Sequence, residues 1–141
     1  MILYLDTSAL VKLYVEEAGS QVVAENLKAA STVATARISY AEARAAFARH
    51  ARHGGLTPAE LRRVIRHLDE EWGQYTVVEI TDGVVRRAAV LAERHELRAY
   101  DAVQLAAALD LRVPKADIKF SSFDERLNRA ARRERLLVTR H

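Results

Sequence analysis

The sequence predicts an α/β fold in which a parallel β-sheet is covered by helices on both faces. Short apolar runs typical of buried strands alternate with segments whose apolar residues recur at helical spacing. The chain has 141 residues and shows no repeat, linker or low-complexity tract, so it fits a single domain over 1–141. Ligands of such sheets bind beyond the carboxyl ends of the strands, and functional residues are expected there.

The first half of the chain is expected to form two strands and three helices. The opening apolar run stops at Asp6, and a helical pattern begins shortly after it. The glycine pair Gly54-Gly55 is a natural helix stop. The elements expected in order are a strand at 2–5, a helix at 8–15, a helix from 19–20, a strand at 32–35 and a helix from 39 to the glycine pair.

The second half opens with the clearest helix of the chain. Thr57-Pro58-Ala59-Glu60 has the form of a capping box with proline at the first helical position. Apolar residues then fall on one helical stripe: Leu61, Val64, Ile65, Leu68 and Trp72. The elements expected after it are a strand at 75–80, a helix capped by Thr81, a helix at 100–111, a strand at 118–121, a helix at 124–133 and a strand at 136–139.

Composition excludes several classes of site. Cysteine is absent, so a disulfide or a thiolate metal site is impossible, and any metal would need oxygen or histidine ligands. No apolar stretch approaches the roughly 20 residues of a membrane span. Met1 leads directly into a strand-like run without the features of an export signal. A soluble, cytoplasmic protein without a membrane partner is expected.

Charge is spread unevenly along the chain. Residues 31–66 carry seven arginines and two acids, and residues 112–141 carry nine basic and four acidic residues. Residues 67–111 carry four arginines and nine acids. This asymmetry favours a phosphate-binding face, although arginines on amphipathic helices also serve simply to solvate the outer surface.

Four acids occupy equivalent places near expected strand ends or helix starts. Asp6 ends the first strand, Glu42 lies in the first turn of the helix from 39, Asp101 begins the helix at 100–111, and Asp124 follows the strand at 118–121. Parallel connections bring such positions to one edge of the sheet, so the four carboxylates are expected to converge. Asp101 heads an apolar row with Leu105 and has no basic residue three or four positions later.

Each acid also has a purely structural explanation. Acids are favoured in the first turn of a helix, where they meet the positive end of its dipole. Ser39 and Glu42 have the spacing of a capping box, and Asp6 and Asp124 stand where helix caps are expected. For Asp124, the pair Ser122 and Glu125 offers a competing box.

A convergent set would favour a metal ion. Clustered carboxylates repel one another, and a divalent cation replaces that repulsion with coordination. An all-oxygen ligand set suits Mg²⁺ or Mn²⁺, ions that activate water and orient a phosphate.

Three segments give the chain a family resemblance: MILYLDTSALVKLY with Glu42, AYDAVQLAAAL, and KFSSFDERL. With them the chain resembles the PIN-domain family and, within it, the VapC-type toxin ribonucleases of type II toxin–antitoxin systems. The resemblance implies a three-layer α/β/α sandwich and a divalent-metal-dependent endoribonuclease that cleaves RNA phosphodiesters by metal-activated water. The implied cofactor is Mg²⁺ or Mn²⁺. The implied partners are an RNA substrate, a cognate antitoxin and a second copy of the chain in a homodimer.

The resemblance also assigns roles to residues. Asp6, Glu42, Asp101 and Asp124 match the acidic catalytic and metal-binding quartet, with Ser8 and Ser122 as hydroxyl residues beside it. The helical pair 39–54 and 57–72 is a candidate antitoxin or dimer surface. Basic residues that are candidates for holding the RNA backbone are Arg37, Arg44, Arg49, Lys119, Arg126 and Arg129.

Three alternatives stay open at this level. A PIN-fold nuclease of RNA processing would share the chemistry but lack an antitoxin. A domain that only binds nucleic acid or protein would use the acids as helix caps. A receiver-type phosphoacceptor would need paired acids near the start, where only Asp6 stands, and a lysine near the last strand, where 136–139 has none.

Overall fold

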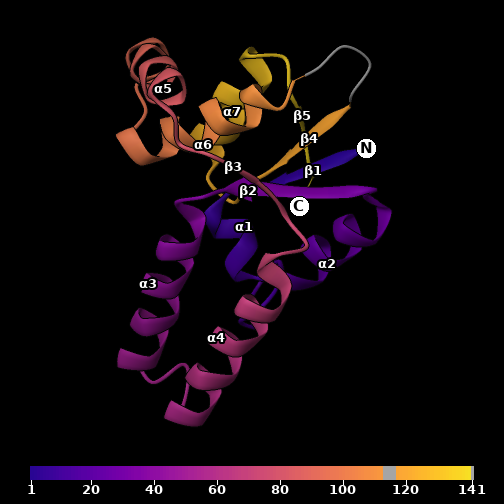
Figure 1. Ribbon diagram of the computed structural model, residues 1–141, viewed down its shortest axis with the longest axis vertical. Coiled ribbons are helices and arrows are strands. Elements are labelled where there is room, and N and C mark those ends of the chain that lie inside the picture. Colours follow the sequence, from indigo (N-terminus) through magenta and orange to yellow (C-terminus); the bar gives the residue numbers. More distant parts are fainter. Residues whose placement is uncertain (113–116, 141) are drawn as a thin grey trace.

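The computed structural model describes residues 1–112 and 117–140, and its centre is a five-stranded sheet with helices on both faces (Figure 1). The strands are β1 (Ile2–Leu5), β2 (Thr32–Ala36), β3 (Thr76–Val78), β4 (Ile118–Ser121) and β5 (Leu137–Val138). Their spatial order is β3-β2-β1-β4-β5, and every pairing is parallel. The predicted α/β class with a central parallel sheet is confirmed.

The strand order creates a crevice at the end of β1. From β1 the chain builds outward through β2 to β3, then returns to the other side of β1 for β4 and β5. Because the direction of winding reverses between β1 and β4, the connections that leave these two strands separate at their carboxyl ends. Leu5 and Ser121, the last residues of β1 and β4, lie opposite one another in the register. Asp6 therefore starts at the mouth of this crevice.

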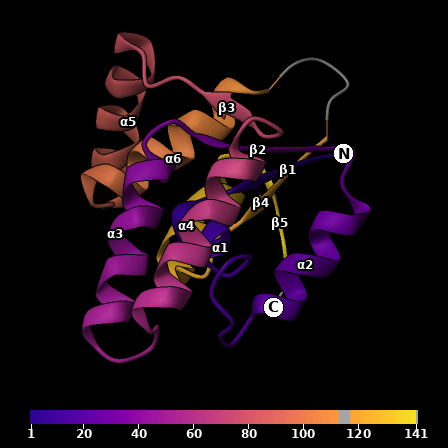
Figure 2. The same cartoon turned by 60° about the horizontal axis from the view of Figure 1, so that its bottom comes forward.

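The helices form two layers around the sheet, as Figures 1 and 2 show from two directions. One layer holds α1 (Thr7–Val11), α2 (Ser20–Ala29), α3 (Ser39–Arg52) and α4 (Pro58–Trp72), and the other holds α5 (Asp82–His95), α6 (Ala99–Asp110) and α7 (Glu125–Arg133). Successive side chains of β1 point to opposite faces of the sheet, so the hydrophobic core is divided into two clusters, one under each helical layer. Leu3 and Leu5 pack with Phe47 on one face, whereas Tyr4 packs with Leu105 and stacks on Phe120 on the other. The three-layer sandwich implied by the family resemblance is confirmed.

Most predicted elements are present, and the differences lie at their ends. The expected helix at 8–15 is shorter, because after Val11 the backbone tightens into turns in which the N–H groups of Lys12, Leu13 and Tyr14 bond carbonyls three residues earlier. The expected strand at 75–80 pairs only over Thr76–Val78. No helix in the described ranges is long and apolar enough to cross a membrane.

The predicted capping box at the start of α4 is confirmed. The Thr57 hydroxyl accepts a hydrogen bond from the Glu60 N–H at 3.1 Å, and the Glu60 carboxylate accepts one from the Thr57 N–H at 3.0 Å. Two backbone donors at the helix end are satisfied in this way. The pair α3 and α4 forms a helical hairpin that extends away from the sheet (Figure 1).

Candidate active site

Asp6 is a buried carboxylate held by short-range hydrogen bonds. It follows β1 directly and caps α1, where its Oδ1 atom accepts the Ala9 N–H at 3.0 Å and the Ser8 hydroxyl at 2.7 Å. Only 4% of the surface of Asp6 is accessible to solvent. Burial raises the pKa of Asp6 to about 6, and the Asp101 charge adds to this, although hydrogen bonds from Ser122, Ser8 and Ala9 oppose it. Asp6 is thus a capping residue and also a buried carboxylate that forms no ion pair with the described residues.

Glu42 is held across the crevice from two other elements. Its Oε1 atom accepts the Thr7 hydroxyl of α1 at 2.8 Å and the Gln104 amide of α6 at 2.9 Å. The capping box that the spacing of Ser39 and Glu42 suggested is wrong, because Ile38 occupies the N-cap position and makes no side-chain capping bond. The Glu42 carboxylate is therefore directed toward α1 and α6.

Asp101 and Asp124 share one arginine. The Arg98 Nε atom lies 3.2 Å from Asp101 Oδ2, and its Nη2 atom lies 3.6 Å from Asp124 Oδ2. The sequence offered Asp101 no basic partner three or four residues later, but the partner comes from three residues earlier. Burial raises the pKa of Asp101, an effect that Arg98 opposes and Asp124 reinforces. Asp124 also caps α7, since its Oδ1 accepts the Leu127 N–H at 3.0 Å.

The four predicted acids line one cavity. It has a volume of about 560 Å³ and lies at the carboxyl edge of the sheet, where Asp6, Glu42, Asp101 and Asp124 all contribute to its wall. Lys12, Arg49 and Arg98 line the same cavity. The expectation that these acids come together is therefore supported at the level of a shared cavity, with positive side chains around it.

The predicted hydroxyl residues tie the two strand-end loops together. Ser8 donates to Asp6 and accepts the N–H of Phe123 at 3.0 Å, which links the loop after β1 to the loop after β4. Ser122 is fully buried, and its hydroxyl oxygen accepts the Asp124 N–H at 3.0 Å. Both serines thus fix the backbone that carries an acid.

The donor chemistry of this cavity fits a hard divalent cation. The four predicted acids offer carboxylate oxygens, the ligands that Mg²⁺ and Mn²⁺ prefer, and Glu17 is a fifth acid in the cavity wall. The raised pKa of Asp6 marks an unmet electrostatic need that a cation would relieve. Within the described residues, no three acidic or histidine side chains already converge closely enough to hold an ion. Two of the carboxylates, those of Asp101 and Asp124, are instead in contact with the guanidinium of Arg98, which occupies the space beside them.

Comparison with known proteins places this geometry in a family. The PIN domain family model matches residues 3–133, which is nearly the whole described fold. The chain belongs to the PIN domain family. Ribonuclease VapC45 of Mycobacterium tuberculosis (strain CDC 1551 / Oshkosh) is 36% identical over 130 residues, which cover 92% of this chain and 89% of the relative.

Solved structures share the fold of this PIN domain, among them two from toxin–antitoxin systems. A toxin–antitoxin complex from Klebsiella pneumoniae matches with a TM-score of 0.65 and 15% identity, covering 86% of each chain. VapC20 of Mycobacterium tuberculosis, a toxin that cleaves the sarcin–ricin loop, matches with a TM-score of 0.66 and 16% identity, covering 91% of this chain and 94% of that one.

Sequence reasoning missed two polar residues that orient Glu42 in this PIN domain. Gln104 is 2% exposed; its amide NH₂ also contacts Thr7 Oγ1 at 3.2 Å and Ser39 Oγ at 3.0 Å, while its carbonyl accepts the Tyr4 hydroxyl at 2.6 Å. Thr7 is the second residue, through its bond to Glu42. The available signal was a glutamine one helical turn after Asp101 within an apolar helix, where a buried amide needs partners.

Proposed function

We propose that this PIN domain is a divalent-metal-dependent endoribonuclease that hydrolyses RNA phosphodiesters and acts in the cytoplasm as the toxin of a toxin–antitoxin pair. The observation that carries the proposal is the single cavity lined by Asp6, Glu42, Asp101 and Asp124. The ribonuclease name of the relative at 36% identity supports the activity. The toxin–antitoxin assembly of the Klebsiella structure supports the biological setting.

Within this proposal the acids have different roles. Asp6, Glu42 and Asp101 would hold the main ion, and Asp124 would serve a second ion or orient water. The bound ion supplies water activation at neutral pH and neutralises charge that develops on the phosphate. Two arginines of the cavity wall, Arg49 and Arg98, would bring positive charge to the substrate phosphates, whereas Lys12 is already paired with Glu17 at 2.8 Å.

The hydrogen-bond network around the acids supplies preorganisation. Glu42 is aligned by Thr7 and Gln104, and Asp6 is aligned by Ser8 and the Ala9 N–H. These donors come from α1 and α6, elements packed on opposite faces of the sheet, so the sandwich itself fixes the spacing of the carboxylates. A site whose ligands are fixed before binding loses less free energy on reorganisation.

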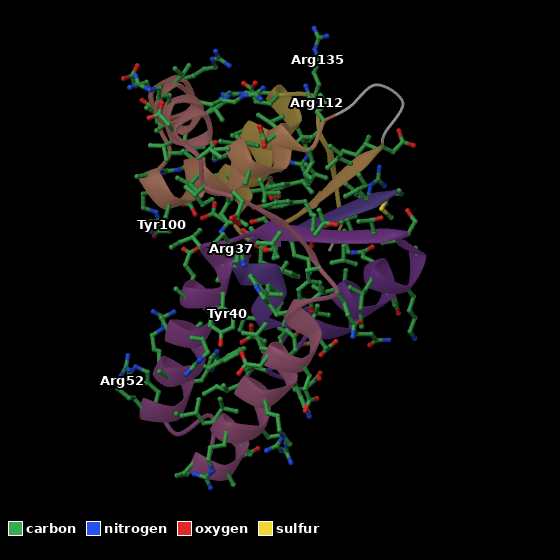
Figure 3. The ribbon with its side chains drawn as sticks, viewed as in Figure 1. Arg37, Tyr40, Arg52, Tyr100, Arg112 and Arg135 are labelled. Atoms are coloured by element: carbon green, nitrogen blue, oxygen red, sulfur yellow. The ribbon has the colours of Figure 1, made fainter. Side chains whose placement is uncertain are left out.

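An apolar groove beside α3 and α4 is the surface we propose for a protein partner, either the antitoxin or a second copy of the chain. It has a volume of about 680 Å³, and the labelled residues Arg37, Tyr40 and Tyr100 in Figure 3 belong to its wall. Ile38 and Tyr100 are 42% and 48% exposed there. Exposed apolar area of this kind favours protein association. The predicted homodimer stays a prediction.

Metal removal tests the proposed activity. The purified protein is expected to cleave a structured RNA in Mn²⁺ or Mg²⁺, to lose that activity in EDTA and to regain it when excess Mn²⁺ is added, because the carboxylates need a cation to bind the phosphate. Cleavage is followed on a denaturing gel, with circular dichroism to verify that EDTA leaves the fold intact. Cleavage that persists in EDTA contradicts metal dependence.

A growth assay separates a toxin from a housekeeping nuclease. Expression of a toxin is expected to arrest growth, and Asp101→Asn is expected to abolish that arrest.

Arg98 is expected to compete with the metal. Because its guanidinium contacts Asp101 and Asp124, Arg98→Gln should tighten Mn²⁺ binding about two- to fivefold, the effect of releasing a partly exposed ion pair. Calorimetric titration measures the change. Arg49→Gln is the matched control, since Arg49 lines the same cavity and has no ion pair among the described residues. Equal tightening in both variants would show that only the overall charge matters.

A further inference from the structure

Three arginines of α7 form a positively charged surface outside the carboxylate cavity. Arg126, Arg129 and Arg133 are spaced so that they share one face of the helix, and they line a separate cavity of about 350 Å³. All three are exposed, and none takes part in an ion pair within the described ranges. Arg132 belongs to the same helix but pairs with Glu125 at 3.2 Å. The positive charge of the three arginines is therefore not neutralised by paired carboxylates.

The other residues of this cavity do not neutralise the positive charge of the three arginines. Glu96, at the end of α5, is the acid in its wall. Glu134, the acid next to α7, is already engaged at 2.8 Å by Arg94 and at 2.7 Å by His95. Three guanidinium groups thus face one carboxylate in the cavity. A bound anion would restore the balance.

His95 adds a buried polar atom to the same wall. Its side chain is 5% exposed and its Nε2 atom lies 2.7 Å from Glu134, whereas its Nδ1 atom is buried and has no hydrogen-bond partner within the described residues. Buried polar nitrogens are normally satisfied. The wall beside the three arginines therefore contains a buried nitrogen whose hydrogen-bonding capacity is unused among the described residues.

The arginine cavity shares a lining residue with a cavity beside the candidate active site. Arg126 lines it and also lines an adjoining cavity of about 370 Å³, whose other residues are Arg98, Asp101 and Asp124. These three residues in turn line the carboxylate cavity. The cavity at the carboxylates and the α7 face are therefore linked by shared lining residues, and α7 lies in the helical layer of α6 (Figure 1).

We propose that the face formed by Arg126, Arg129 and Arg133 binds the phosphodiester backbone of the RNA substrate on one side of the cleaved bond. This proposal rests on the proposed function, because the substrate is taken to be RNA. Arginine is suited to the role, since its planar fork binds phosphate oxygens in pairs. Arg126 lines one cavity with Asp101 and Asp124, and this favours RNA over an acidic protein segment, because the substrate of the proposed reaction must lie beside these carboxylates.

The test compares two triple variants that change charge equally. One carries Arg126→Gln, Arg129→Gln and Arg133→Gln. The control carries Arg62→Gln, Arg63→Gln and Arg66→Gln on α4, where all three arginines are exposed and lie outside the cavities described above. Binding of a fluorescein-labelled single-stranded RNA is measured by anisotropy at several salt concentrations in EDTA, where the proposed cleavage does not occur. Thermal unfolding verifies that both variants fold.

The α7 variant is expected to bind RNA at least tenfold more weakly at 0.1 M salt and to lower the slope of log affinity against log salt by about 2, as for three lost phosphate contacts on a single strand. The α4 control should change both quantities much less. Equal losses in the two variants, or unchanged RNA binding in the α7 variant, overturn the proposal, and the second result leaves an acidic protein segment as the occupant. The proposed function fails by a different result, namely cleavage that survives EDTA or Asp101→Asn.

Discussion

Asp101→Asn is expected to slow RNA cleavage by a hundredfold to a thousandfold or more, the order of loss seen when one preorganised charge contact is removed from an active site. The Asp101 carboxylate heads the inward row of α6, and its side chain is 15% exposed at the cavity wall. Asparagine keeps the size of the side chain and removes the negative charge. The rate is measured on a structured RNA at saturating Mn²⁺.

Asp110→Asn is the matched control for that experiment. Asp110 is the last residue of the same helix, is exposed and lies outside the carboxylate cavity, so its change removes the same charge without touching the site. Its cleavage rate should equal that of the wild type. If Asp101→Asn also retains the wild-type rate, Asp101 is not part of the catalytic machinery and the quartet proposed here is wrong.

Asp6→Asn should make the metal-free protein more stable at neutral pH, by about 2–3 kcal/mol if the pKa near 6 is converted at 1.4 kcal/mol per pH unit. The wild-type carboxylate is buried at this pH without a cation, whereas asparagine carries no charge to desolvate. Asparagine also keeps an oxygen that accepts the Ala9 N–H, so the cap of α1 survives. Denaturant unfolding in EDTA at pH 7.5 gives the free energy of unfolding of both proteins.

The pH dependence of this difference has a defined sign. The pKa of Asp6 is about 6 in the folded protein, against an ordinary value of 3.8 that applies to the unfolded chain. Between these values the folded state binds more protons, so the stability of the wild type falls as pH rises through the window. The advantage of Asp6→Asn should therefore be absent near pH 4, grow up to about pH 6 and stay constant above it. A variant less stable than the wild type at pH 7.5 would mean that Asp6 serves only as a cap.

The fold was predictable because its signals are local and repeated. The continuous apolar run Ile2–Leu5, the capping box at Thr57 and the apolar stripe of α4 are each a local signal for one element, and parallel connections then bring the acids to one edge. The fold and membership of the PIN domain family are both confirmed. The prediction of a toxin-type ribonuclease agrees with the name of the relative at 36% identity.

The parts that the sequence did not reveal depend on contacts between distant residues. Gln104 meets Glu42 across a separation of 62 positions, and Phe123 meets Ser8 across 115, so no periodicity connects them. The contact of Arg98 with Asp101 is not evident from spacing within the helix, because Arg98 is the N-cap residue that precedes α6. The capping box that the spacing of Ser39 and Glu42 offered as an alternative is absent, because Ile38 and not Ser39 is the N-cap residue of α3. Spacing alone does not say which residue starts a helix.

Calorimetric titration of Mn²⁺ into the wild type and into Asp101→Asn tests the central claim most directly. The cavity lined by Asp6, Glu42, Asp101 and Asp124 is expected to bind the ion in the wild type, and loss of one carboxylate should abolish that binding together with RNA cleavage. Absence of Mn²⁺ binding in both proteins would contradict the account, because the acids would then be capping residues of a PIN domain that works by binding alone.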